Sequence, residues 1–147
     1  MPKKIPKNFV YIVNPEAGKL SVTKKKKVIK QIDSNKNPNI IFTKSSEESS
    51  SLARYYMNRK DIVIACGGDG MHNLIAQQAI ETSSIIGILP FGRGNDFARS
   101  LGINSMKKAI ENLKRDKVTE CRYLNIEFSN SKKIALTCAG VGLLSEA

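Results

Sequence analysis

Tryptophan is absent from the 147-residue sequence, histidine occurs once, and aromatic residues make up only 6% of the chain. No segment approaches the roughly 18–20 consecutive apolar residues that a membrane-spanning helix requires. Residues 1–9 are basic but lack the apolar segment of a secretion signal. These absences exclude a helical membrane protein and a secreted one, and they predict one domain located in the cytoplasm.

Cysteine is also scarce, with only Cys66, Cys121 and Cys138 in the chain. The number is odd, the three residues are far apart, and no Cys-x-x-Cys or Cys/His spacing occurs. The pattern excludes a zinc site and a disulfide framework. Because the three cysteines lie in or beside apolar segments, we expect buried free thiols.

The charge is unevenly distributed. The formal net charge is +11, and residues 1–60 contain 14 Lys/Arg against 4 Asp/Glu, whereas residues 61–147 contain 10 against 9. The run of four lysines at 24–27 is consistent with a solvated helix face. It is equally consistent with attraction to nucleotide phosphates, acidic lipid headgroups or nucleic acid. The few aromatic residues among the lysines argue against a dedicated nucleic-acid surface, so no nucleic-acid partner is expected.

Strand and helix patterns alternate along the first 116 residues. Short apolar segments at 9–13, 39–42, 62–66 and 85–89 predict strands, and helices are predicted at 21–34, from Ser45 or Ser46 to 57, and at 71–81, 95–101 and 106–116. This alternation predicts a parallel sheet covered by helices on both faces. Two consecutive strands, 118–128 and 132–139, then predict the beginning of a β-rich region.

Three unusual loops follow predicted strands. They are "NPEAGK" at 14–19, "GGDG" at 67–70 and "PFGRGND" at 90–96. Ligands bind at the carboxyl ends of parallel strands, so we expect the three loops at one edge of the sheet. Glycine lets a backbone approach a ligand closely, and N–H groups before a helix attract anions, which favours a phosphate. Neither GxxxxGK[ST] nor GxGxxG is present, since Phe97 occupies the place of the last glycine.

Two aspartates in these loops have two interpretations each, and a histidine follows the second loop. Asp69 is either a turn residue that accepts backbone N–H bonds or a carboxylate that holds hydrated Mg²⁺ or a ribose hydroxyl. Asp96 is either a helix cap or a ligand-binding group beside Asn95. His72 is a weak candidate for acid–base chemistry, because no carboxylate or nucleophile is assigned beside it.

Together the three loops resemble the diacylglycerol kinase catalytic-domain family, which includes bacterial lipid kinases and sphingosine kinases. The family pattern is NPxSG, GGDGT and PxGTGNDFAR. This sequence has "NPEAG" at 14–18, "GGDGM" at 67–71 and "PFGRGNDFAR" at 90–99. The order and spacing agree, and the resemblance extends over nearly all of residues 8–147.

The resemblance implies a Rossmann-like three-layer α/β domain with a mainly parallel sheet, related to NAD kinase and 6-phosphofructokinase. It implies an ATP-dependent, Mg²⁺-assisted kinase that transfers the γ-phosphate to a lipid hydroxyl of a diacylglycerol or sphingosine-like acceptor. Asp69 is the implied catalytic residue. The implied nucleotide-binding residues are Asn14, Pro15, Glu16, Ala17, Gly18, Thr43, Gly67, Gly68, Asp69, Gly70, Met71, His72, Asn73, Gly92, Arg93, Gly94, Asn95 and Asp96.

The resemblance also implies partners and a larger protein. We expect a lipid acceptor and peripheral association with an anionic membrane surface. A homo-oligomer is compatible with the resemblance. We expect residues 1–147 to be the ATP-binding part of a longer chain, whose β-rich second domain supplies the catalytic glutamate. The 147 residues alone are therefore not expected to phosphorylate lipid.

Four positions depart from the family pattern. Ala17 and Met71 replace hydroxyl residues, Leu74 replaces a glutamate, and Arg93 replaces a threonine. These departures keep open a degenerate, non-catalytic module that binds nucleotide or membrane. A small-molecule kinase similar to NAD kinase is a further alternative, although its later glycine motif differs from "GRGNDFAR".

Overall fold

The computed structural model describes residues 8–33, 37–115 and 118–137. Its centre is a parallel four-stranded sheet in the order β2-β1-β3-β4. The strands are β1 (Phe9–Val13), β2 (Asn39–Phe42), β3 (Ile62–Gly67) and β4 (Ile86–Pro90). They lie within one or two residues of the predicted segments, because each is a short β-rich run that ends at a turn-forming sequence.

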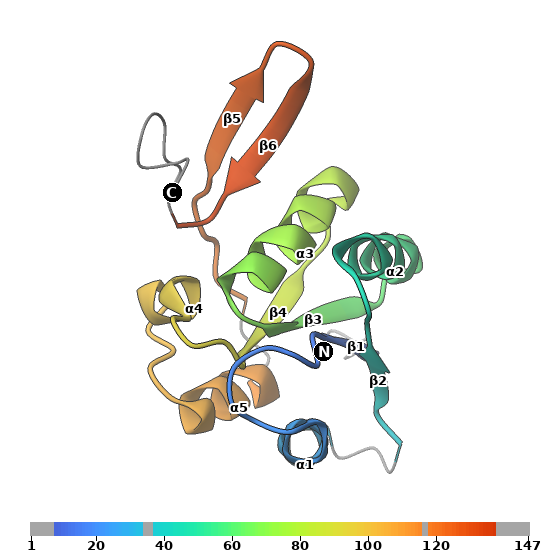
Figure 1. The fold of residues 1–147 in the computed structure, drawn as a ribbon, viewed down its shortest axis with the longest axis vertical. Helices are drawn as coiled ribbons and strands as arrows, with labels where there is room; N and C mark the ends of the chain where they lie inside the picture. Colours follow the sequence, from blue (N-terminus) through green and yellow to red (C-terminus); the bar gives the residue numbers. More distant parts are fainter. Residues whose placement is uncertain (1–7, 34–36, 116–117, 138–147) are drawn as a thin grey trace, which may run out of the picture.

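Helices cover both faces of this sheet, as Figure 1 shows. On one face lie α1 (Val22–Ile32) and α5 (Met106–Lys114), and on the other lie α2 (Ser46–Asn58) and α3 (Asp69–Thr82). The short α4 (Asp96–Ser100) follows β4. The predicted three-layer α/β fold is confirmed. Among the described residues, no helix is long and apolar enough to cross a membrane.

Serine side chains define where three of the helices begin. Ser21, Ser45 and Ser105 each accept a hydrogen bond from the backbone N–H three residues later. Such caps satisfy N–H groups that have no partner inside the helix. α2 gains further stability from Glu47 and Glu48, because the amino end of a helix attracts negative charge.

An antiparallel hairpin follows the α/β layers. It consists of β5 (Leu124–Phe128) and β6 (Ser131–Ala135), and it projects away from the sheet in Figure 1. The strand predicted over 118–128 is too long at its start, since 118–123 pairs with no strand in the described part of the chain. The second strand begins at Ser131 rather than 132 and ends at Ala135, so 136 and 137 are not strand; positions 138 and 139 of the prediction lie outside the described residues.

The cysteine prediction is correct for one residue and wrong for another. Cys66 is fully buried in β3, whereas Cys121 is exposed. Cys121 lies in the unpaired segment 118–123, so no neighbouring strand covers it. Cys138 lies outside the described residues.

Candidate functional site

The candidate site lies where the direction of chain winding reverses. The chain leaves β1 toward β2 on one side, but it leaves β3 toward β4 on the other. Ligands of open α/β sheets bind at this reversal, outside the carboxyl ends of the strands. The loops at 14–19 and 67–70 therefore flank the reversal, and the loop at 90–96 lies beside them.

The three loops pack backbone against backbone. A Cβ on Gly92 would lie 2.4 Å from the Gly68 Cα, and a Cβ on Gly18 would lie 1.9 Å from the Phe91 backbone oxygen. The N–H of Phe91 also donates to the Gly67 carbonyl at 2.8 Å. Only glycine permits such approach, so the predicted convergence of the loops is confirmed. We call the surface formed by 14–18, 67–71 and 92–96 the loop rim.

The amino end of α3 forms the middle of the loop rim. The first bond within this helix runs from the His72 N–H to the Gly68 carbonyl, at 3.0 Å. The N–H groups of Asp69, Gly70 and Met71 precede that bond, so the helix offers them no carbonyl. Gly70 is exposed, and nothing lies within 4 Å of a Cβ placed there. The helix end can therefore receive an anion.

The Asp69 side chain joins the second loop to the third. Its carboxylate accepts hydrogen bonds from the N–H groups of Asp96, at 3.0 Å, and Phe97, at 2.9 Å. Partial burial alone would raise the pKa of Asp69, but these two bonds lower it below its ordinary value, assisted by His72 and Arg99. Asp69 thus stays ionised and caps α4 from another loop.

This arrangement corrects the interpretation of Asp96 as a helix cap. The cap position of α4 is Asn95, in a left-handed conformation with φ of 55°, and its side chain makes no capping bond. The Asn95 amide instead donates to the Gly92 carbonyl at 2.8 Å. Asp96 forms an ion pair with Arg99. The N–H groups at the start of α4 thus have their hydrogen-bond acceptor in Asp69, because the cap residue Asn95 provides none.

Several expected nucleotide contacts turn their side chains away from the loop rim. Thr43 is buried, and its hydroxyl accepts a bond from the Ser49 hydroxyl at 2.7 Å. Ala17 and Met71 pack in the hydrophobic core. Asn73 is bound to the hairpin, donating to the Ile134 carbonyl and accepting from the Leu136 N–H. Ala17 and Met71 therefore leave little side-chain surface for a ligand.

His72 is fully buried beneath the second loop. Burial lowers its pKa from 6.5 to about 4, although Asp69 and the backbone of Leu89 favour the protonated ring. Neither ring nitrogen makes a hydrogen bond of normal geometry. The ring is therefore neutral near pH 7, and its position does not support acid–base chemistry with a ligand on the loop rim.

Of the remaining expected residues, Gly67 is buried at the end of β3, whereas three others are exposed. Glu16, Arg93 and Gly94 are exposed, and the Asn14 side chain accepts a bond from the Glu16 N–H at 3.0 Å, which fixes the first loop as a turn. Within the described part of the chain, no three His, Cys, Asp or Glu side chains gather to hold a metal. A Mg²⁺ here would depend on fewer than three carboxylates, together with phosphate oxygens and water.

One buried residue at this site was not predicted from the sequence. Lys25 lies in the run of lysines at 24–27, yet its side chain has no exposed surface and donates to two carbonyls of the first loop. Its spacing from Ile29 and Ile32, four and seven residues later, is the only sequence signal of burial, because these positions share one helix face.

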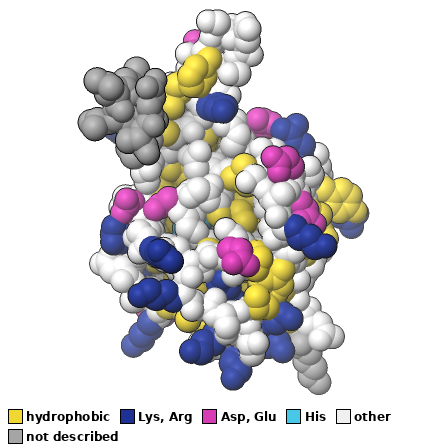
Figure 2. Space-filling view, in the orientation of Figure 1, with side chains coloured by type: hydrophobic (Ala, Val, Ile, Leu, Met, Phe, Trp, Pro, Cys, Tyr) yellow, Lys and Arg dark blue, Asp and Glu magenta, His cyan; other side chains and the backbone are white. Residues whose placement is uncertain are grey.

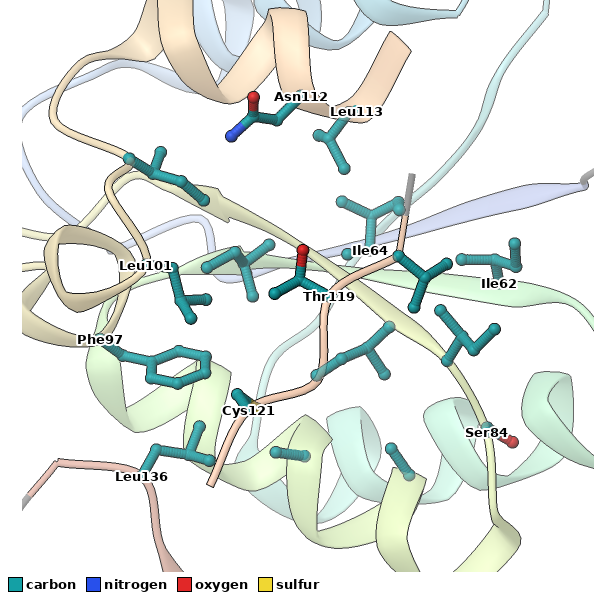
Figure 3. Close-up of a pocket in the computed structure, with 18 of the residues that line it drawn as sticks. Ile62, Ile64, Ser84, Phe97, Leu101, Asn112, Leu113, Thr119, Cys121 and Leu136 are labelled. Carbon is teal, nitrogen blue, oxygen red and sulfur yellow. The ribbon is translucent and has the colours of Figure 1, made fainter. Parts of the chain in front are cut away.

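A cavity of about 510 Å³ lies away from the loop rim, beside β4. Figure 3 shows Ile64, Leu113 and Phe97 around it, with Thr119 and Cys121 on the segment that crosses it. Its walls are mostly aliphatic. Phosphate groups would lose their hydration there without compensation, so this cavity is a poor candidate for a nucleotide.

Comparison with known proteins identifies the family. The sequence matches the diacylglycerol kinase catalytic domain over residues 8–126. "Probable lipid kinase YegS-like" of Enterobacter sp. (strain 638) is 41% identical over 81 residues, covering 49% of this chain and 27% of the relative. "Diacylglycerol kinase iota" of Homo sapiens is 30% identical over 100 residues, covering 65% of this chain and 9% of the relative.

Solved structures agree with the sequence comparison. Two crystal structures from Bacillus anthracis str. Sterne, both carrying a diacylglycerol kinase name, align with TM-scores of 0.64 and 0.61 at 26% and 24% identity. Each alignment covers 74% of this chain and 42% of the solved chain. The chain thus spans less than half the length of these relatives. Sequence and fold agree that this chain belongs to the diacylglycerol kinase catalytic domain family.

Proposed function

We propose that the loop rim binds the phosphates of ATP and that the chain is the ATP-binding domain of a lipid kinase. One observation carries the proposal. Three glycine-containing loops meet backbone to backbone, in front of the free N–H groups of α3, at the reversal point of a parallel sheet. Such a surface suits an anion with several oxygens that a backbone can approach closely.

The proposed roles follow from what each group presents to the loop rim. The N–H groups of Asp69, Gly70 and Met71 would donate to phosphate oxygens. The exposed Arg93 guanidinium would pair with phosphate, because its planar donors match that geometry. Each Asp69 oxygen holds one hydrogen bond and retains a second lone pair. These lone pairs fit a role beside the hydration shell of Mg²⁺.

In the proposed reaction, a lipid hydroxyl attacks the γ-phosphate. Mg²⁺, when bound, supplies neutralisation of phosphate charge. The chain itself would orient the phosphates and hold the second and third loops together through Asp69. We propose a diacylglycerol or sphingosine-like acceptor, consistent with the family. We propose none of the described residues as the proton acceptor for the lipid hydroxyl.

The proposed membrane association rests on the charged surface. Figure 2 shows Lys and Arg side chains gathered at the bottom of the view, over the position of α1. The lysines of α1 other than Lys25 are exposed, and α5 on the same face adds Lys107 and Lys114. Each basic residue close to an acidic membrane is worth about 1 kcal/mol, so several suffice for reversible, peripheral binding of a cytoplasmic protein.

Calorimetric titration of the chain with ATP and ADP, with and without Mg²⁺, tests nucleotide binding. We expect saturable binding that Mg²⁺ strengthens. Phosphorylation assays on the protein that carries this chain, with diacylglycerol, a sphingosine-like base and NAD as acceptors, then identify the acceptor class. Phosphorylation of NAD alone would replace the lipid-kinase proposal with the small-molecule one.

A second candidate function is a non-catalytic module. It is favoured by Met71, because the side chain that replaces the family threonine is packed in the core and presents no hydroxyl to the loop rim. Absence of nucleotide binding in the titration would support this candidate. Restoration of binding by M71T together with R93T would then attribute the loss to those two departures.

A further inference from the structure

A lysine ammonium lies buried beneath the first loop. The Lys25 Nζ donates to the Pro15 carbonyl at 2.6 Å and to the Asn14 carbonyl at 3.2 Å, and the side chain has no exposed surface. The other lysines of α1 are exposed. Lysine is almost never fully buried unless its charge is paired, because an ammonium removed from water loses its hydration. Burial here therefore requires the two carbonyls.

The two bonds fix the orientation of successive peptide groups in the first loop. A peptide group is planar, so a carbonyl directed at Lys25 directs the N–H of the same group the opposite way. The Asn14 carbonyl also accepts a longer bond from the Ala17 N–H, at 3.4 Å. Pro15 has no N–H of its own. The conformation of this loop thus depends on a side chain from α1, outside the loop itself.

Lys25 also lies near the contact between the first and third loops. Its Nζ is 5.8 Å from the centroid of the Phe91 ring, a distance at which a cation is attracted to an aromatic face. The backbone oxygen of Phe91 is the atom that a Cβ placed on Gly18 would meet first. Displacement of the lysine would affect both loops at the point where they meet.

The charge environment of Lys25 is simple. Burial lowers the pKa of the ammonium, and the carboxylate of Glu16 opposes that change. Lys26, the next lysine, is directed elsewhere, with its Nζ 5.4 Å from the Phe42 ring centroid.

We propose that Lys25 is a positioning residue, which holds the first loop and its contact with the third loop in the conformation that receives the nucleotide. The proposal rests on the proposed nucleotide site. Lys25 acts through the carbonyls of Asn14 and Pro15 and does not touch the nucleotide. A purely structural role for the lysine would stabilise the fold without changing affinity for the nucleotide.

Lys25→Met tests the proposal, because methionine keeps much of the length and removes the charge and the donors. Lys27→Met is the matched control, since Lys27 is an exposed lysine two positions later on the same helix. Affinity for Mg-ADP is measured below the melting transition of every variant. Hydrogen bonds from a charged group are worth about 1.5–3 kcal/mol, so K25M is expected to bind about 10- to 100-fold more weakly. K27M is expected to bind as the unchanged chain does.

Hydrogen exchange without nucleotide supplies an independent measurement. In K25M the amides of Glu16, Ala17 and Gly18 are expected to exchange at least about tenfold faster, while amides of β3 keep their protection. If K25M binds Mg-ADP as tightly as the unchanged chain, the lysine has only a structural role and the proposal is wrong. If the unchanged chain binds no nucleotide, the proposed function fails and this inference fails with it.

A measurement on the unchanged chain covers the case in which K25M does not fold. Mild acylation with acetic anhydride, read by peptide mass, should modify Lys25 far more slowly than Lys27. Mg-ADP should slow the modification of Lys25 several-fold further and leave Lys27 unaffected. Equal modification of the two lysines, or no effect of Mg-ADP on Lys25, would contradict the proposed coupling.

Discussion

Replacement of His72 by leucine should remove a specific dependence of stability on pH. His72 is the only histidine in the sequence, and burial lowers its pKa from 6.5 to about 4. Between those values the unfolded chain binds a proton that the folded chain does not. The folded state therefore loses stability as the pH falls from 6.5 toward 4. At pH 5 the loss relative to pH 7.5 is about 2 kcal/mol.

Urea denaturation at pH 7.5, 6.5, 5.5 and 5.0 measures this effect for the unchanged chain and for H72L. Leucine has no proton to bind and fills the buried position with apolar atoms, so the variant should lose about 2 kcal/mol less between pH 7.5 and 5.0. Any shared contribution from carboxylates cancels in the comparison. Parallel curves for the two proteins would refute the conclusion that His72 is buried as a neutral imidazole.

Three further perturbations test the loop rim and the basic face. G92A should weaken Mg-ADP binding and lower the melting temperature, because its Cβ would meet the Gly68 Cα at 2.4 Å. The control G70A should not lower the melting temperature, because nothing lies within 4 Å of a Cβ placed there. D69N should destabilise the chain by about 1.5–3 kcal/mol and speed amide exchange at Asp96, and equal exchange rates would argue against capping of α4 by Asp69. Binding to lipid vesicles should increase with anionic lipid and decrease with salt, and insensitivity to both would reject membrane docking by the basic face.

The sheet and the convergence of the loops could be predicted from the sequence because both follow from local patterns. The segments 9–13 and 39–42 are apolar, β-rich and bounded by turn residues, and they became β1 and β2 without change. The parallel arrangement then placed the ends of the strands at one edge. No residue far away in the sequence was needed for either conclusion.

Contacts between distant segments could not be predicted. Asp69 caps a helix that begins 27 residues later, and no local pattern links the two. Thr43 and Met71 occupy motif positions, but packing of α2 against β1 and of α3 against the core decides where their side chains point. The burial of Lys25 could not be predicted, because a charged side chain is expected to be exposed. Its carbonyl partners are brought to it only by the fold.

The attachment of the hairpin to α3 restricts how the chain can be shortened. Asn73 and Gln77 lie one turn apart on α3, and together they hold backbone groups of Ile134 and Leu136. A chain that stops after α5 would still contain the whole sheet and the loop rim. It would also leave two amide side chains without the β6 backbone, on the helix whose first turn forms the middle of the loop rim. A shortened chain made to test the proposed nucleotide binding should therefore extend through residue 136.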